Sequence, residues 1–297
     1  MIDGVLLKGY GGFYYVYGED RVWECSLRGR FRIKDQEFLP GDRVTILPKE
    51  EENKGTIESV APRRNELTRP PIANVDQAIL VFAMTSPKPD LNLLDRLLIQ
   101  AADSDIEPII VFTKVDKYQE TVLQGAPNLY ELTEDYRKIG YTVFEVSSKT
   151  GQGIPEIGDR LKNKISVLAG PSGAGKSSLV NALSPGKELK TGQISSKSKR
   201  GRHTTRHVEL MVCSGGLLAD TPGFSSLLLP EMKRAELADY FPEFADFLGG
   251  CRFNSCLHDK EPNCVIKAAL EEGRISPVRY EHYLLYLKEV IEAERKY

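Results

Sequence analysis

Residues 170–177, GPSGAGKS, constrain this chain most strongly, because they match the phosphate-binding pattern G-x-x-x-x-G-K-[ST]. The apolar residues Ile165–Ala169 before them are typical of a buried strand, and Lys176–Leu183 after them are typical of a helix. A strand-to-helix turn of this kind aims backbone N–H groups and the positive end of a helix at phosphates. The pattern predicts a nucleotide-binding α/β domain, but it does not select the base.

A second set of residues, earlier in the chain, predicts recognition of guanine. Asp116, in the sequence TKVD, follows the apolar run 109–112, which is typical of a central parallel strand. A carboxylate on the loop at the carboxyl end of such a strand can accept two hydrogen bonds from the guanine edge, whereas adenine offers no such pair of donors. The sequence SSK at 147–149 follows another apolar run, and its backbone N–H groups are placed to contact the guanine O6.

The order of these motifs indicates a circular permutation. In ordinary GTPases the phosphate loop comes first, whereas here the base-reading motifs precede residue 170 and the sequence DTPG at 220–223 follows it. Asp220 is predicted to hold Mg²⁺ through water, and the Gly223 N–H to sense the γ-phosphate. The basic segment 197–206 lies where the first switch is required, and we expect Thr205, or else Thr204, to bind Mg²⁺ in the GTP state.

The full predicted nucleotide site combines these motifs. Lys176 is expected to reach the β- and γ-phosphates and to act catalytically together with Gly223, and the Ser177 hydroxyl to bind Mg²⁺. The residues predicted to bind GTP are Thr113, Lys114, Val115, Asp116, Ser147, Ser148, Lys149, Gly170, Pro171, Ser172, Gly173, Ala174, Gly175, Lys176, Ser177 and Ser178.

Phe224 follows Gly223, at the position where many GTPases carry the glutamine that orients the attacking water. An apolar side chain cannot position water, so intrinsic hydrolysis should be slow and another polar group is required. His203 is the nearest candidate in the first switch. The alternative is that His203 is an ordinary exposed loop histidine.

The N-terminal segment, up to about residue 61, differs in character. Short β-rich runs alternate with Gly, Asp and Pro turns, which favours a small barrel, and we expect an OB-fold. Four cations recur at a spacing of two, so that on a strand they share one face suited to an RNA backbone; the alternative is a solvated strand face. These predicted RNA-binding residues are Arg28, Arg30, Arg32 and Lys34. Residues 63–74 read as a linker, and 91–102 as a helix with Asp90 as its N-cap.

Four soft ligands lie close together near the C-terminus, in the spacing Cys251-x₄-Cys256-x-His258-x₅-Cys264. Three thiols and one imidazole suit a closed tetrahedral zinc site, which leaves no position for water and therefore indicates a structural role. Cys25 and Cys213 read as ordinary strand residues. Helices are expected at 234–248, at 265–272 and from Pro277 onward, with Ser276 as the N-cap of the last one.

Composition sets the remaining limits. The 297 residues carry a net charge of −2, which gives no support to nucleic-acid binding by the chain as a whole. The N-terminal apolar run is too short for a signal peptide, and no run approaches a membrane span. We therefore expect a cytoplasmic monomer with no membrane partner.

Taken together, the motif order, the sequence GRHTT at 201–205 and the Cys/His spacing resemble the ribosome small-subunit-dependent GTPase A (RsgA) family of bacteria. The resemblance implies an OB-fold domain (1–64), a permuted P-loop GTPase domain (65–228) and a helical zinc domain (229–297). It further implies that the chain binds the small (30S) ribosomal subunit and its rRNA late in maturation, is stimulated by it to hydrolyse GTP to GDP, and then leaves.

Two other classes remain open from the residues alone. A guanylate kinase shares the pattern G-P-S-G-x-G-K-S-x-L, but should begin near its phosphate loop and lacks TKVD; phosphoryl transfer to GMP would reveal it. An RNA-binding scaffold with a structural nucleotide would bind GTP without turnover.

Overall fold

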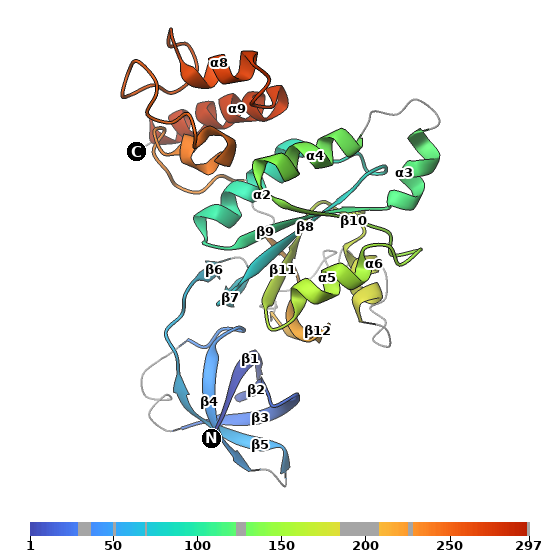
Figure 1. Ribbon diagram of the computed structural model, residues 1–297. Helices are drawn as coiled ribbons and strands as arrows, with labels where there is room; N and C mark the ends of the chain where they lie inside the picture. Colours follow the sequence, from blue (N-terminus) through green and yellow to red (C-terminus); the bar gives the residue numbers. More distant parts are fainter. Residues whose placement is uncertain are drawn as a thin grey trace, which may run out of the picture.

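A computed structural model describes residues 1–28, 37–49, 52–68, 70–122, 129–184, 208–224 and 228–295. Its described part forms an elongated molecule with a β-barrel at one end, an α/β sheet in the middle and a helical region at the other end (Figure 1). Within the described residues, no helix has the length and apolar composition needed to cross a bilayer.

The N-terminal barrel is closed, with strand order β1-β2-β3-β5-β4 and β4 returning to pair with β1. This order is that of an OB-fold, as expected. Its interior contains fully buried Trp23 with Leu6, Val16, Ile46 and Ile57, contributed by alternating strand positions. The strands are β1 (Ile2–Tyr10), β2 (Phe13–Gly18), β3 (Arg21–Leu27), β4 (Arg43–Lys49) and β5 (Lys54–Val60).

The segment expected to be a linker contains a short hairpin instead. Strands β6 (Glu66–Thr68) and β7 (Pro71–Ala73) pair antiparallel. Proline was misleading here because Pro71 stands at the first position of its strand, where a missing N–H is tolerated. The hairpin is fastened to the barrel: Arg63 donates to fully buried Asp42 at 2.7 and 3.0 Å, and a Cβ on Gly41 would lie 1.9 Å from the Ala73 carbonyl oxygen.

The central sheet has the strand order β10-β9-β8-β11-β13-β12, with β12 antiparallel to β13 and the other neighbours parallel. Helices α2 and α4 cover one face, and α5 and α6 cover the other (Figure 1). The elements are β8 (Gln77–Ala83), α2 (Leu91–Asp103), β9 (Glu107–Thr113), α3 (Val115–Val122), α4 (Leu129–Ile139), β10 (Thr142–Val146), α5 (Ile154–Leu161), β11 (Ile165–Ala169), α6 (Lys176–Leu183), β12 (Leu210–Cys213) and β13 (Gly216–Phe224).

Barrel and sheet share packing contacts. Leu7 of β1 belongs to the core on the α2 face of the sheet, and half-buried Val5, Tyr15 and Tyr17 pack against that core. Lys8 also pairs with Glu209, just before β12, at 2.7 Å. The barrel is therefore packed against the sheet as well as tethered to it.

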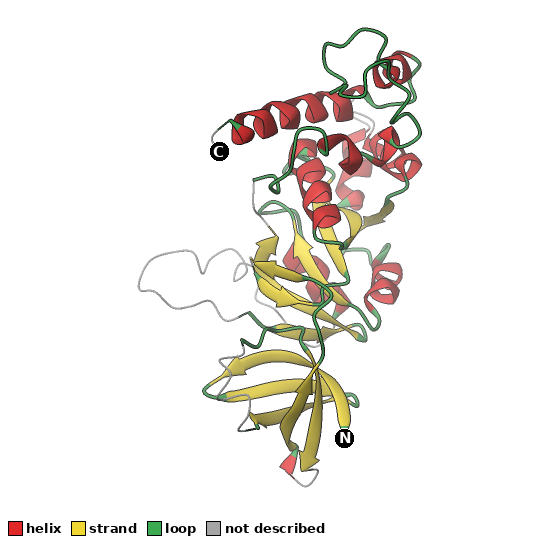
Figure 2. Cartoon of the chain, turned by 90° about the vertical axis from the view of Figure 1, so that its left-hand side faces the viewer, coloured by secondary structure: helices red, strands yellow, loops and turns green. Residues whose placement is uncertain are grey.

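The C-terminal region is partly helical, as seen above the sheet in Figure 2. The helix expected at 234–248 is wrong: two short 3₁₀ turns occupy that stretch, because Pro242 lacks an N–H donor and Phe241 before it is extended. Ser276 stands at the N-cap of the last helix, but its side chain makes no capping hydrogen bond. The elements are η2 (Leu237–Tyr240), η3 (Pro242–Phe244), α8 (Val265–Glu271) and α9 (Pro277–Glu294).

Candidate nucleotide and metal sites

The phosphate-loop sequence joins the carboxyl end of β11 to α6, in the middle of the parallel strands. Gly170 has φ 130°, and a Cβ there would lie 2.0 Å from the Val81 carbonyl oxygen, so only glycine fits. Lys176, the first residue of α6, folds over the loop and donates to the Gly170 and Pro171 carbonyls at 2.7 and 2.8 Å. The loop therefore has the strand–turn–helix setting that phosphate binding requires.

Residues of the TKVD sequence contact this loop directly. Thr113, the last residue of β9, donates its hydroxyl to the Ala174 carbonyl. Lys114 has φ 60°, which turns the chain out of the strand, and its ammonium donates to the Gly173 carbonyl at 2.8 Å. Strand β8 lies between β9 and β11, so these contacts pass over its end. Two motifs almost sixty residues apart thus meet at one edge of the sheet.

The sequence led us to expect Asp116 on a loop. It lies instead in the first turn of α3. Its carboxylate oxygen Oδ1 accepts a hydrogen bond of 2.8 Å from the Ser147 hydroxyl. Ser147 is fully buried just after β10, and its hydroxyl oxygen accepts from the Thr150 N–H at 3.2 Å. From the sequence, Ser147 was expected to contact the base only through its backbone, because a serine after a strand is too weak a signal to predict this side-chain role.

Electrostatics at this edge favour an anion. Burial lowers the pKa of Lys176, and burial together with nearby Lys117 lowers the pKa of Lys114. Within the described residues neither ammonium forms an ion pair with a carboxylate; both donate to backbone carbonyls instead. Two partly desolvated cations at the strand ends suit a polyphosphate.

The remaining predicted nucleotide-site residues are only partly visible. The backbone of residues 220–224 belongs to β13, and Phe224 pairs with Ala169 at the end of β11, so this motif runs beside the phosphate loop. The side chains of Asp220 and Phe224 are not described, and His203, Thr204 and Thr205 lie outside the described residues. Their predicted roles stay predictions.

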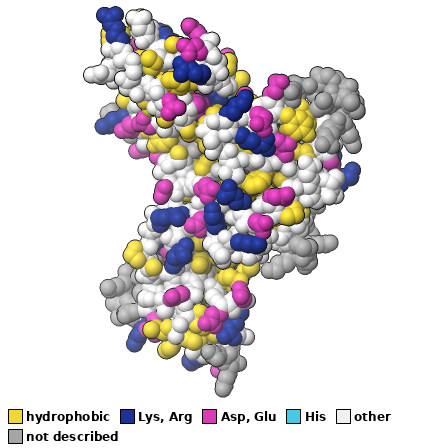
Figure 3. Space-filling view, viewed as in Figure 1, with side chains coloured by type: hydrophobic (Ala, Val, Ile, Leu, Met, Phe, Trp, Pro, Cys, Tyr) yellow, Lys and Arg dark blue, Asp and Glu magenta, His cyan; other side chains and the backbone are white. Residues whose placement is uncertain are grey.

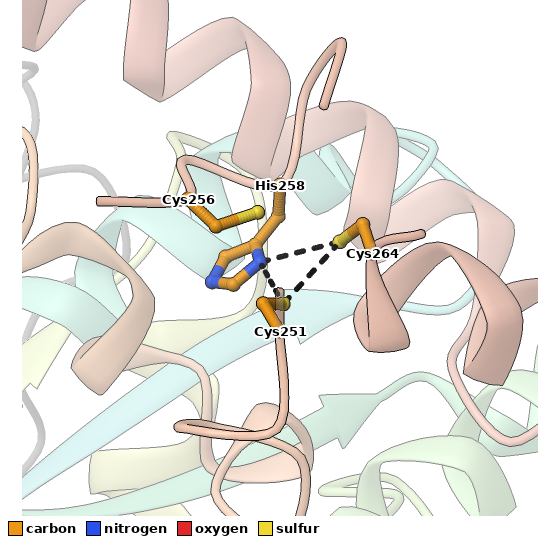
Figure 4. A group of neighbouring side chains, drawn as sticks. All are labelled: Cys251, Cys256, His258 and Cys264. Carbon is orange, nitrogen blue, oxygen red and sulfur yellow. Dashed lines mark hydrogen bonds between the residues drawn. The ribbon is translucent and has the colours of Figure 1, made fainter. Parts of the chain in front are cut away.

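The cysteine and histidine side chains near the C-terminus point toward one another (Figure 4). The ligand atoms of Cys251, Cys256, His258 and Cys264 all lie within 4.8 Å of one another, and Nδ1 of His258 lies 3.6 and 3.4 Å from the Cys251 and Cys264 sulfurs. Three sulfurs and one nitrogen at these separations can hold one metal ion.

The surroundings of this cluster fit a cation. Burial lowers the pKa of His258, which favours the neutral imidazole that binds metals, and burial raises the pKa of the Cys256 thiol to about 12, so that thiolates here require a compensating positive charge. Tyr280 and Tyr283 donate to the carbonyls of His258 and Leu257 at 2.6 and 2.8 Å. These tyrosines of α9 fix the loop that carries the ligands.

Comparison with known proteins decides the family. The model of the RsgA GTPase matches residues 60–230, and the model of the RsgA N-terminal domain matches residues 3–57. The chain belongs to the RsgA GTPase family. It is therefore a GTPase, and its base-reading motifs precede its phosphate loop.

Full-length similarity supports this membership of the RsgA family. The chain is 53% identical over 297 residues, all of both chains, to the "Small ribosomal subunit biogenesis GTPase RsgA" of Moorella thermoacetica, and 49% identical to the protein of the same name from Carboxydothermus hydrogenoformans, over 99% of each. Solved structures agree: YloQ, described as a circularly permuted GTPase, is 38% identical with a TM-score of 0.78, covering 99% of this chain and 96% of that one. YjeQ from Thermotoga maritima is 38% identical with a TM-score of 0.82, covering 98% of each chain.

Of the predicted basic stripe of this RsgA-family chain, Arg28 lies within the described residues. Arg28 lies just beyond the end of β3, not on a strand, and is paired with Glu58. Arg30, Arg32 and Lys34 lie outside the described residues. Cations and carboxylates are interspersed on the face shown in Figure 3, without a large single-sign patch among the coloured residues.

Proposed function

We propose that this GTPase acts on the small (30S) ribosomal subunit late in its assembly, hydrolyses GTP to GDP and phosphate when stimulated by the subunit, and then dissociates. The relatives named for small-subunit biogenesis support this, since they match the chain from end to end. The main support for the nucleotide site is that Thr113 and Lys114 donate hydrogen bonds to carbonyls of the phosphate loop, close in sequence to the Asp116–Ser147 hydrogen bond.

Each motif has a proposed role. Asp116 reads the guanine edge, held by Ser147, while the loop N–H groups and Lys176 bind the β- and γ-phosphates. Mg²⁺, when bound, neutralises charge on the transferring phosphate. Ser177 and Asp220 would hold it, joined in the GTP state by Thr205 or Thr204. The Gly223 N–H senses the γ-phosphate, and loss of that phosphate on hydrolysis releases the switches.

Water positioning is the step that requires help. Because Phe224 cannot orient water, we propose that His203 does so once the ribosome orders the first switch. His203→Ala should leave nucleotide affinity nearly unchanged and lower subunit-stimulated turnover by about 10²–10⁴-fold, as expected for a positioned polar group. Stimulated turnover within a few-fold of that of the unmodified chain would assign the water to the ribosome or to backbone groups.

For the cysteine–histidine cluster we propose one structural Zn²⁺ ion per chain. The donor set supports this choice, because three thiolates and one imidazole form a closed tetrahedral set without a position for water. Contact with rRNA through Arg28, Arg30, Arg32 and Lys34 is proposed on their spacing alone. We also propose that the protein is cytoplasmic and monomeric.

The decisive experiment is phosphate release from GTP with and without purified small subunits, with large subunits as the control. We expect slow intrinsic turnover and a strong increase with small subunits only. GTP binding without turnover in either case would favour the scaffold, and phosphoryl transfer to GMP would favour a kinase.

A further inference from the structure

Helix α2 is buried on two sides. Leu94, Leu97, Leu98 and Ala101 face the core of the central sheet, whereas Ile99 belongs to the core of the C-terminal region. The helix therefore forms a wall shared by the GTPase domain and the region that carries the metal cluster, and a movement of α2 acts on both.

Asp95 is the centre of the contact between α2 and α9. Its side chain is fully buried and accepts hydrogen bonds from Tyr136 of α4 at 2.7 Å and from Arg279 and His282 of α9, both at 2.6 Å. Arg279 also binds Glu243 of η3 at 2.7 and 2.9 Å. A buried carboxylate that loses such partners is costly, so these donors fix α9 against α2 in one arrangement.

Other contacts extend the docking along the helix. Arg96 forms two hydrogen bonds of 2.7 Å with Glu289 of α9, and the Tyr286 hydroxyl donates to the Asn92 carbonyl at 2.6 Å. Near the C-terminal end of α2, the Gln100 amide donates to the Leu228 carbonyl at 2.8 Å. The C-terminal region thus contacts α2 over most of its length.

The other end of α2 leads to the nucleotide site. Residues 84–90 connect β8 to α2, and Asp90 caps the helix by accepting from the Leu93 N–H at 3.0 Å. Lys114 donates both to the Ser86 carbonyl in this connection and to the Gly173 carbonyl in the phosphate loop. One side chain and one helix therefore span the path from the phosphate loop to α9.

We infer that α2 couples the nucleotide state to the position of the metal-binding region, and that Asp95 is the positioning residue for this coupling. The C-terminal region is then connected to the nucleotide site through α2 as well as through the chain that follows β13. Coupling between two events is reciprocal: if GTP and GDP favour α9 docking unequally, loss of docking changes their relative affinities by the same factor. The inference rests on the proposed nucleotide site.

The test uses the full-length chain with Asp95→Asn and, as a milder change, Tyr136→Phe, which keeps the ring and removes one donor. Glu281→Gln is the matched control, because Glu281 lies on α9 but is exposed. Hydrogen exchange reports docking of α9, and titration with GDP and a non-hydrolysable GTP analogue gives the ratio of their dissociation constants.

We expect faster exchange in α9 for Asp95→Asn, and a change in that ratio of about fivefold or more, the lower end of typical couplings between sites. Tyr136→Phe should change the exchange rate and the ratio of dissociation constants in the same directions, but by less. Glu281→Gln should change neither quantity. If Asp95→Asn does not fold, Tyr136→Phe decides.

Two results overturn the inference. Faster exchange in α9 with an unchanged ratio places the coupling outside α2, and unchanged exchange removes Asp95 as the positioning residue. Absence of guanine-nucleotide binding in the unmodified chain is a different failure, since it contradicts the proposed site itself.

Discussion

The metal cluster takes its donors from residues 251–264, whereas the candidate nucleotide site joins segments spread from Thr113 to Lys176. A short loop with a bound cation can order itself, because the free energy of metal binding contributes directly to folding. The nucleotide site requires the parallel sheet, which brings the ends of β9, β10 and β11 to one edge. Damage to the first site should therefore disorder mainly the loop around it, apart from the change in the ratio of GTP and GDP affinities that α2 transmits. Damage to the second site should spread through the sheet.

The largest expected effect tests the local character of the metal site. Cys264→Ser should lose the metal and, with it, on the order of 10 kcal/mol of binding free energy that orders the loop. We expect the C-terminal region to lose its cooperative unfolding transition while nucleotide binding stays measurable.

Metal analysis and thermal unfolding check this prediction. Cys213→Ser is the control, because Cys213 is a buried cysteine of β12 outside the cluster. A metal-free variant with an intact C-terminal region would show that tyrosine packing alone orders the loop, and the contrast with the nucleotide site would disappear.

Asp116→Asn tests whether base reading depends on one side chain. The amide reverses part of the donor and acceptor pattern, so preference should move from GTP toward XTP by about 10³-fold or more, since an unpaired buried polar group discriminates strongly. Competition titrations with both nucleotides measure the ratio. An unchanged ratio would exclude Asp116 as the base reader.

Lys176→Ala tests the phosphate loop. Loss of the ammonium that lies over the loop should lower subunit-stimulated turnover on the order of 10²–10³-fold, as for removal of a single group that stabilises the transition state. Lys162→Ala, at the exposed end of α5, should retain full turnover. Equal rates in the two variants would remove the loop from the active site.

Ser147→Ala is expected to have the smallest effect. It removes one hydrogen bond to the Asp116 carboxylate, and bonds to charged groups contribute about 1.5–3 kcal/mol, so GTP affinity should fall by about 10- to 100-fold. Ser148→Ala should change affinity by about twofold or less, because its predicted contact uses the backbone. If both variants bind alike, the 2.8 Å contact does not hold the base reader.

Sequence patterns alone were sufficient wherever a function is carried by close neighbours in the chain. The Cys/His spacing predicted a cluster that the structure brings within 4.8 Å, and the glycine pattern predicted the turn between β11 and α6. The helix expected at 234–248 does not form, because Pro242 lacks the N–H that a continuous helix requires, and two short 3₁₀ turns take its place.

Only the tertiary structure decided which distant residues meet. Nothing in the pattern around Ser147 predicts that its hydroxyl holds Asp116, because that contact depends on β10 lying beside β9. Asp95 lies within the helix expected at 91–102, and the sequence gives it no particular role, yet its side chain is fully buried between α2, α4 and α9. The physical reason is the same in both cases: local sequence determines turns, caps and metal ligands, whereas a buried hydrogen bond between distant segments exists only after the segments have packed.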